Sequence, residues 1–330
     1  MTEEQFIVVD EGGDGQRLDR WIQKNVQGVP FGLIQKLLRK RAIRIDGKRT
    51  TKGDTRLSTG QEVRIPALEE KAEAPKTERK LKDSDIKFIR SLVIYEDDDV
   101  IAINKPSGLA VQGGSKTTRH IDGLLAGLAD KKKGVKPKLV HRLDKDTSGV
   151  MLLAKHDKAA RELGFLFKGR DVRKYYWALV APAPEEQNGT IRAGIRKAGG
   201  PNREKMIIDD EEGKHATTDF CVIERAHTQA AFVAFWPRTG RTHQIRVHAS
   251  EILGTPILGD YKYGFDDENW EDLELKERLH LHAQRIMLPH PIRQGKFLDI
   301  HAELPKDMKK NYEMLGFDVH YQEDPFEGLE

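Results

Sequence analysis

The stretch HRLDKDTSG, residues 141–149, is the most informative part of the chain. Residues 138–140 before it and residues 150–154 after it are mainly apolar, so the pattern predicts a strand, a charged turn and a second strand. Gly149 gives this turn the backbone freedom that a tight bend requires. A carboxylate mounted in this way is held rigidly, as catalysis needs, although a solvated charged turn would have the same composition.

The turn contains two carboxylates, Asp144 and Asp146. They point the same way if the local chain is extended and diverge if it is turned. A glycosidase with paired acids would hold them about 5–9 Å apart. Aspartate in a turn also commonly hydrogen-bonds its own backbone. We therefore expect one catalytic aspartate and one structural aspartate.

The composition narrows the class of protein. The chain has 330 residues, of which 38% are hydrophobic and 33% charged, and no apolar run approaches the ~20 residues of a membrane helix. Its acidic start lacks the layout of a secretory signal. One cysteine, Cys221, excludes an intramolecular disulfide and a site of several cysteine ligands. We expect a cytoplasmic protein that does not enter membranes.

The charge is unevenly distributed. Residues 16–66 contain 13 Lys or Arg and 4 Asp or Glu, a local net charge of +9, whereas the whole chain carries +3. Two segments of helical spacing and an alternating strand that runs into the turn Asp46-Gly47 predict a compact basic module. Such a module favours a polyanionic partner over a merely solvated surface. Its candidate RNA-binding cations are Arg39, Lys40, Arg41, Arg44 and Lys48.

The predicted organisation has four parts. Residues 1–15 form a lead-in, residues 16–66 the basic module, residues 67–90 a linker rich in Glu, Lys and Ala, and residues 91–330 a larger domain. Strands interspersed with helices give the larger domain an α+β fold with a mixed sheet. Within it, strands are predicted at 174–180, 220–223 and 230–236, and helices at 156–167 and 242–253.

Two further segments could carry chemistry. Tyr176 shares a strand face with Ala178 and Val180, where it could stack on a base and offer a hydroxyl, or simply belong to the core. Thr242 is a candidate N-cap for a helix that places His243 and Arg246 on one face, and the arginine could pair with a carboxylate or a phosphate.

The histidines are weaker candidates. His280 and His282 alternate in a predicted strand and would share a face, as some metal ligands do, but the sequence offers no clear third ligand. His243 and His248 fall on different helical faces. We therefore predict no metal site.

The stretch 141–149 closely resembles the catalytic motif of the RluA-type pseudouridine synthases. Residues 174–180 resemble the second motif of that family, and residues 240–248 resemble the third. Further family signatures follow in the expected order at 98–106, 259–264 and 279–283, and the basic module resembles the small RNA-binding domain first described in the small-subunit ribosomal protein S-four. Within the family, Gly28-Val29-Pro30, Arg39-Lys40 and residues 144–149 look most like the synthases that act on large-subunit rRNA.

The resemblance implies a pseudouridine synthase fold, largely antiparallel, and a cofactor-free isomerisation of uridine in large-subunit rRNA by a monomer. Asp144 would be the essential carboxylate, acting on the anomeric carbon or on the 2′ proton of a flipped-out nucleotide. Arg246 would be the cation that keeps Asp144 ionised, and Tyr176 the tyrosine that packs on the target base. Arg142 would fill the gap that the flipped nucleotide leaves.

The sequence is also compatible with two other functions. A ribosome-associated RNA-binding protein without catalysis would explain the basic module, but it would not require Asp144. A hydrolytic glycosylase would use Asp144 with water and would release free uracil, whereas an isomerase leaves the mass of the RNA unchanged.

Overall fold

The computed structural model divides into two compact units, Met1–Arg79 and Lys80–Glu330. It describes residues 4–26, 29–67, 81–113, 119–129, 134–169, 171–200, 205–266, 270 and 278–328. Two predicted features, Gly28 and most of the linker at 68–80, lie outside these residues. No helix in the described ranges has the length and apolarity needed to cross a membrane.

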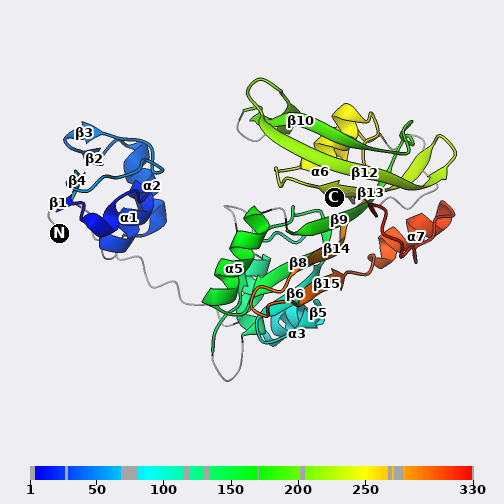
Figure 1. Cartoon of the computed structure of the whole chain (residues 1–330), viewed down its shortest axis with the longest axis horizontal. Coiled ribbons are helices and arrows are strands. Elements are labelled where there is room, and N and C mark those ends of the chain that lie inside the picture. The colour runs from blue at the N-terminus through cyan, green and yellow to red at the C-terminus, as the bar shows by residue number, and fades with distance from the viewer. Residues whose placement is uncertain are drawn as a thin grey trace. The chain divides into compact units, whose positions relative to one another are not determined.

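The first unit packs two helices on a small antiparallel sheet (Figure 1). Trp21, Ile34, Leu38 and Val63 are part of its buried core. The residues of the turn Asp46-Gly47 have φ values of 47° and 75°, as the predicted hairpin requires. The elements are β1 (Gln5–Val8), η1 (Glu11–Gly13), α1 (Leu18–Asn25), α2 (Phe31–Arg39), β2 (Arg44–Ile45), β3 (Lys48–Arg49) and β4 (Glu62–Ile65), with sheet order β1-β4-β2-β3.

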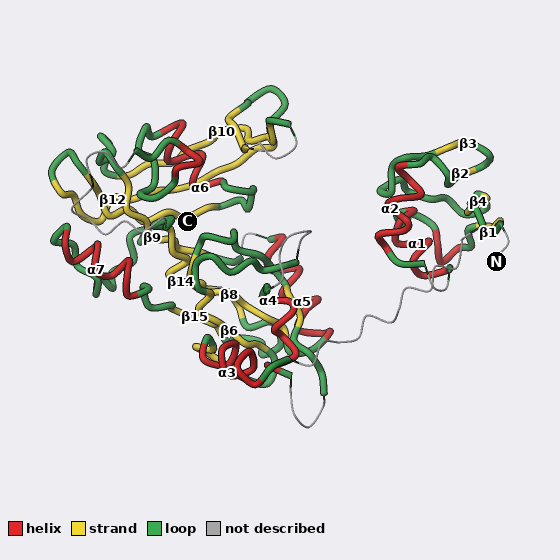
Figure 2. The backbone as a smooth tube through the Cα atoms, turned by 180° about the vertical axis from the view of Figure 1, so that it is seen from behind, coloured by secondary structure: helices red, strands yellow, loops and turns green. Residues whose placement is uncertain are grey.

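The second unit is built on one large mixed sheet, so the predicted α+β class is confirmed (Figure 2). Its strands pair antiparallel except β14 with β8, which are parallel. The path of the sheet is β11 (Lys205–Ile208), β10 (Asn188–Ala198), β12 (Lys214–Ala226), β13 (Ala230–Pro237), β9 (Arg173–Val180), β14 (Leu281–Pro289), β8 (Ser148–Ala154), β6 (Val100–Lys105) and β5 (Val93–Glu96), with β15 (Phe297–His301) on β14 and β7 (Lys138–Leu139) on β8.

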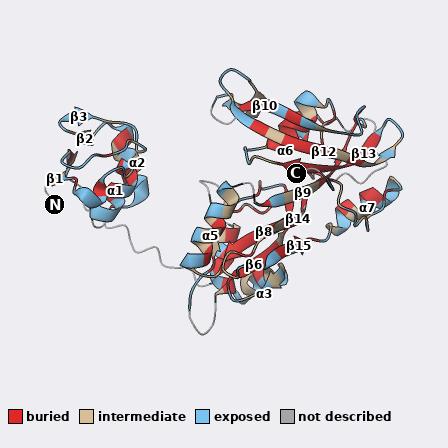
Figure 3. Ribbon diagram, in the orientation of Figure 1, coloured by how far each residue is buried: buried red, intermediate tan, exposed pale blue. Residues whose placement is uncertain are grey.

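Helices cover both faces of this sheet, so its central strands are buried (Figure 3). α3 (Asp83–Ser91) packs Ile89 against one face of β6 and β8, and α5 (Asp157–Lys168) packs Leu163 against the other. α3 occupies most of the last part of the segment predicted as linker (residues 67–90). Because Ile89 belongs to the core of the second unit, that unit begins earlier than predicted. The remaining helices are α4 (Ile121–Leu124), η2 (Leu125–Leu128), α6 (Gln244–Val247), η3 (His248–Ile252), η4 (Tyr261–Tyr263) and α7 (Lys306–Met314).

The central strand β9 separates two packed layers. Tyr175, Trp177 and Leu179 belong to the cluster that includes α7, whereas Ala178 and Val180 belong to the cluster that includes α6. Tyr176 packs on this second side, as its alternation with Ala178 and Val180 predicts. The two faces of β9 therefore open onto different surroundings.

Candidate active site

The stretch 141–149 forms the predicted turn between β7 and β8. Gly149 has a φ of 113°, and a Cβ atom there would lie 2.1 Å from the carbonyl oxygen of Ala283 on β14. Only glycine fits this close approach. At the other side of the turn, the fully buried Lys105 donates hydrogen bonds of 2.9 Å to the carbonyl oxygens of Pro106, Leu109 and Lys145. The turn is therefore fixed from both sides.

The turn forms one wall of a cavity of about 290 Å³. The predicted residues Asp144, Tyr176 and Arg246 all line it, and so does Arg142. Asp144 is the only carboxylate among the described residues that line the cavity. The remaining lining residues are His141, Leu143, Thr147, Phe167, Lys174, Pro237, Thr239, Gly240, Arg241, Thr242, His243, Gln244, Ile245 and Leu281.

The Asp144 carboxylate lies among cations. Its side chain is 26% exposed, and burial raises its pKa above the ordinary value of 3.8. The charges of Arg246, Arg142 and Lys105 oppose that rise and favour the ionised form. Asp146, by contrast, is exposed, and its backbone carbonyl accepts a hydrogen bond of 2.6 Å from the Ser107 hydroxyl. The two aspartates of the turn thus have different environments.

Arg246 makes a bidentate ion pair with Asp260. The Nε–Oδ2 and Nη2–Oδ1 distances are 2.7 and 2.6 Å, and both side chains are almost fully buried. Burial opposes the charge of the guanidinium, but its hydrogen bonds to Asp260 and the negative charges of Asp260 and Asp144 together raise its pKa. Arg246 therefore acts on Asp144 through its charge, while Asp260 holds it in place. Sequence reasoning quoted Asp260 only as part of a family signature and missed this contact.

Tyr176 extends from β9 toward the same cavity. Burial raises the pKa of its hydroxyl, and the charge of Asp144 raises it further. The hydroxyl is therefore neutral at physiological pH. Beside it, the His141 ring stacks on Phe167 at 4.4 Å between centroids and accepts a hydrogen bond from the Leu152 amide. Burial lowers the pKa of His141 to about 3, so this ring is a neutral part of the wall.

The helix predicted at 242–253 begins later than expected. His243 has a left-handed backbone with a φ of 53°, so Thr242 is not the N-cap and α6 starts at Gln244. The Gln244 side chain instead accepts hydrogen bonds from the Thr239 hydroxyl and the Arg241 amide. The prediction that His243 and Arg246 share a helical face is consequently wrong, because His243 lies outside the helix.

His243 links the cavity to Tyr263. Its Nδ1 lies 2.8 Å from the Tyr263 hydroxyl, which accepts a hydrogen bond of 3.1 Å from the Met206 amide. If the hydroxyl donates to Nδ1, every group in this chain is satisfied and the proton of the neutral imidazole lies on Nε2. Burial lowers the pKa of His243 to about 4, which favours that neutral ring. Nε2 lies 3.8 Å from Oδ2 of Asp144.

The other candidate histidines have structural partners. His280 contacts the Leu258 carbonyl at 3.1 Å and the Asn311 side chain at 2.7 Å. His282 contacts the Ser148 hydroxyl at 2.9 Å and the Ala302 carbonyl at 3.0 Å. Both rings are buried and hydrogen-bonded through both nitrogens, so neither offers a free ligand atom.

A different cluster, formed by Asp97, Asp99 and His290, has the spacing of a cation site. Its polar atoms are already engaged: Asp97 Oδ2 lies 2.8 Å from both the Tyr95 hydroxyl and His290 Nε2. The guanidinium of Arg293 supplies positive charge beside the cluster, with its Nε 3.5 Å from Asp99. These contacts tie the turn between β5 and β6 to the loop after β14.

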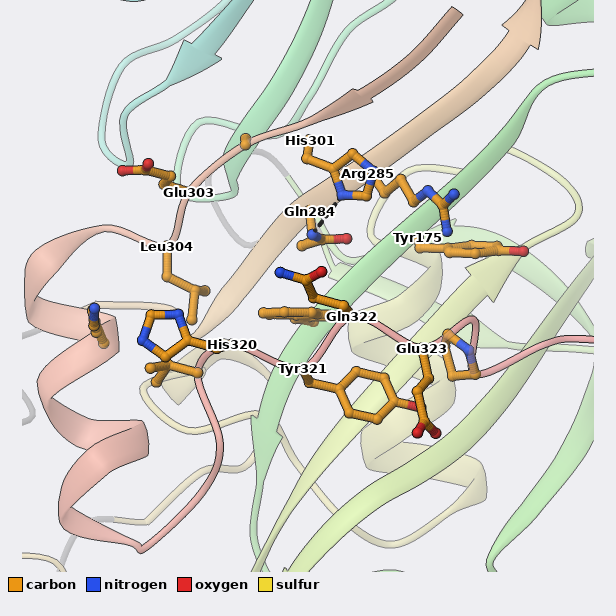
Figure 4. A pocket seen from close by; sticks show the side chains of 15 residues that line it. Tyr175, Gln284, Arg285, His301, Glu303, Leu304, His320, Tyr321, Gln322 and Glu323 are labelled. Carbon is orange, nitrogen blue, oxygen red and sulfur yellow. Dashed lines mark hydrogen bonds between the residues drawn. The ribbon is translucent and has the colours of Figure 1, made fainter.

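A larger cavity of about 720 Å³ lies against the opposite face of β9 (Figure 4). Tyr175 and Trp177 line it from β9, Gln284 and Arg285 from β14, and residues 319–323 from the C-terminal segment. Some of the polar groups that line it are paired. Arg285 makes a bidentate ion pair with Asp299, and the Tyr175 hydroxyl donates a hydrogen bond of 3.2 Å to Asp324.

The predicted RNA-binding cations of the first unit lie on and after α2. Arg39, Lys40, Arg41 and Lys48 are exposed and Arg44 is half-buried. Arg142 in the second unit is exposed at the cavity.

Comparison with known proteins gives consistent matches. Residues 99–251 match the family described as RNA pseudouridylate synthase. "Ribosomal large subunit pseudouridine synthase C" of Vibrio vulnificus is 35% identical over 95% of this chain and 97% of its own length. The protein of the same name from Escherichia coli strain K12 is 36% identical over 94% of this chain and 95% of its own.

A solved human structure, RNA pseudouridylate synthase domain containing 4, is 29% identical, with a TM-score of 0.60. It matches 71% of this chain and 97% of its own length. The solved structure and the two relatives, which are nearly as long as this chain, indicate the same family. The chain therefore belongs to the RluA-type RNA pseudouridine synthases and is an enzyme of that family.

Proposed function

We propose that this enzyme converts specific uridines of large-subunit rRNA to pseudouridine, with Asp144 as the essential carboxylate. The relatives that match nearly the whole chain carry the ribosomal large subunit in their names. The observation that supports the catalytic assignment most strongly is the cavity in which Asp144 is the only carboxylate among the described lining residues.

The reaction is an isomerisation. The bond between C1′ and N1 of the target uridine breaks, the uracil turns, and C1′ forms a bond to C5. The C5 proton leaves and a proton is placed on N1, so the atoms balance without a cofactor. Asp144 either attacks C1′ or removes the 2′ proton, and in both cases it must be ionised. Arg246, Arg142 and Lys105 favour that state against the effect of burial.

The cavity suits a single nucleoside. Its volume of about 290 Å³ is at the small end of the range for ligand pockets, so we propose that the target uridine enters it flipped out of the RNA. Tyr176 would pack on the uracil and help to remove the C5 proton. Arg142, exposed at the cavity, would fill the gap in the RNA stack.

The lining of the cavity argues against a hydrolytic glycosylase. Most glycosidases use two carboxylates that flank the bond, one as acid and one as base or nucleophile. Asp146 is the nearest other carboxylate in sequence, but it is exposed and is not among the lining residues. A binding protein without catalysis would not need a partly buried carboxylate, which is costly to keep ionised.

The basic module of residues 16–66 would add affinity for structured RNA. Its exposed cations Arg39, Lys40, Arg41 and Lys48, together with Arg44, would contact phosphates. This assigns the first unit a role in positioning the substrate and the second unit the chemistry.

The test uses large-subunit rRNA transcribed without modifications. The purified enzyme should produce carbodiimide-resistant adducts at defined uridines and leave the mass of the RNA unchanged. Released uracil would contradict the proposal, and so would an rRNA pseudouridine map that is the same in cells with and without this protein. Enzyme carrying Asp144→Asn is the matched control and should produce no adducts.

A further inference from the structure

The outward face of α5 carries an exposed aromatic ring among cations. Lys158, Arg161, Phe165 and Lys168 are all exposed and are spaced by three, four and three residues, which places them on one face of the helix. Phe165 is 61% exposed, and Lys168 Nζ lies 6.0 Å from its ring centroid. We call these four residues the α5 stripe.

The stripe lies beside the active-site cavity. Phe167, at the end of the same helix, lines that cavity and stacks on His141. Phe165 precedes it by two residues, about 3 Å along the helix axis, and faces outward instead of toward the cavity. A polynucleotide strand that leaves the cavity around the end of α5 would meet the stripe directly.

We propose that the α5 stripe binds the single-stranded RNA next to the target uridine, with one base stacked on Phe165. This inference rests on the proposed RNA substrate. An aromatic ring flanked by cations is the pattern by which proteins hold unpaired nucleotides, because the cations contact phosphates and any base can stack on the ring. Phe165 gives the flanking base a site, and Arg161 and Lys168 lie one turn away on each side of it.

The charges on the stripe favour RNA over other partners. A second copy of this chain placed face to face would bring three cations against three cations. Two acidic residues adjoin the stripe. Asp157 makes an ion pair with Lys138, and the contact of Glu162 with Arg161 Nε, at 3.4 Å and largely exposed, contributes little. An acidic protein would satisfy the cations but would supply no base for Phe165.

The test measures binding of fluorescein-labelled oligouridylate to the full-length protein by anisotropy. Phe165→Ala should weaken binding at least about fivefold, the smallest effect expected for losing one base–aromatic stack. The matched control is Phe297→Ala, which removes a ring that is 73% exposed on β15 and should leave affinity unchanged. Both side chains are exposed, so both variants should melt at the wild-type temperature.

Two further measurements separate stacking from charge. Replacing Lys158, Arg161 and Lys168 by glutamine should reduce the slope of log Kd against log salt by about 2, since each phosphate contact on a single strand contributes about 0.7. Phe165→Ala should not weaken binding of polyglutamate, which has no base to stack. An equal loss with polyglutamate would overturn the proposal in favour of an acidic partner, and an unchanged affinity for oligouridylate would overturn it outright.

The two proposals can fail separately. If the enzyme modifies large-subunit rRNA while Phe165→Ala binds oligouridylate as the wild type does, the stripe proposal alone is wrong. If rRNA is not modified but Phe165→Ala weakens binding to oligouridylate and not to polyglutamate, the stripe binds RNA and the proposed substrate is wrong.

Discussion

Strand β9 separates two cavities that differ in size and in the charged residues that line them. Tyr175 and Trp177 line a cavity of about 720 Å³, whereas Lys174 and Tyr176 line one of about 290 Å³. In the larger cavity, charged groups such as Arg285 are paired with other side chains. In the smaller one, Asp144 lies 3.8 Å from the neutral ring of His243. A partly buried carboxylate among cations, and not the larger volume, distinguishes the proposed active site.

The strongest contrast between the cavities comes from removing one carboxylate in each. Asp144→Asn should lower the single-turnover rate at least about 10³-fold, because the amide neither attacks carbon nor accepts a proton. Glu303→Gln in the larger cavity should leave the rate unchanged. Tritium release from rRNA labelled at uridine C5 measures both. An Asp144→Asn enzyme that keeps more than about a tenth of the wild-type rate would remove the basis for the assignment.

The same variant makes a prediction about stability. Burial raises the pKa of Asp144, so the folded state holds its proton more tightly than the unfolded state. The folded protein is therefore penalised by this carboxylate above its folded pKa and relieved as pH falls through it. Asp144→Asn should be as stable as the wild type at pH 7 or more stable, by up to about 2 kcal/mol, and thermal melting measures the difference. A marked loss of stability would mean that Asp144 holds the fold.

Two adjacent tyrosines sharpen the comparison, because they face opposite cavities. Tyr176→Phe should reduce the single-turnover rate about 10²-fold if its hydroxyl helps to remove the C5 proton. Tyr175→Phe should leave the rate unchanged and cost about 1 kcal/mol of stability through the lost hydrogen bond to Asp324. If the two variants react at equal rates, the Tyr176 hydroxyl takes no part in proton removal and the ring only packs on the base.

His243 provides a test within the smaller cavity. If the Tyr263 hydroxyl donates to Nδ1, the Nε2 proton faces Asp144 and would favour the ionised carboxylate. His243→Ala should then lower the rate about tenfold near neutral pH and move the acid limb of the pH profile upward. Gln places an N–H donor close to the position of Nε2, so His243→Gln should recover part of the rate. A glutamine variant no better than the alanine variant would contradict the role of the Nε2 proton.

The smallest effect is expected from Arg142. Its charge favours the ionised form of Asp144, so Arg142→Gln should raise the pKa of Asp144. With saturating RNA, the acid limb of the rate should shift upward by a fraction of a pH unit, because the carboxylate is ionised over a narrower range. Arg241 lines the same cavity and contacts the His215 carbonyl, so Arg241→Gln is the matched control and should cause no shift.

The sequence predicted features that depend on local pattern. The hairpin at Asp46-Gly47, the strands on each side of residues 141–149 and the alternation along β9 follow from turn chemistry and from period-two burial. The helix predicted at 156–167 agrees with α5 within one residue at each end. The motifs also placed Asp144, Tyr176 and Arg246 at one site, although their roles stay predictions.

Contacts between distant parts of the chain were not predictable in this way. Lys105 fixes the carbonyl of Lys145 across 40 residues, and neither position has a local pattern that indicates it. Arg246 was expected to pair with a carboxylate or a phosphate, but no local pattern indicated that its ion-pair partner is Asp260, 14 residues away. The left-handed backbone of His243 and its contact with Tyr263, 20 residues away, likewise have no local pattern that indicates them.

The close approach at Gly149 has a consequence for redesign. Every substitution there would force β8 and β14 apart, since the smallest side-chain atom already meets the Ala283 carbonyl. Libraries that aim at a new nucleoside should therefore keep position 149 constant and vary residues on the wall formed by α6, such as Ile245. In directed evolution, this glycine should tolerate no exchange even when selection favours a different base.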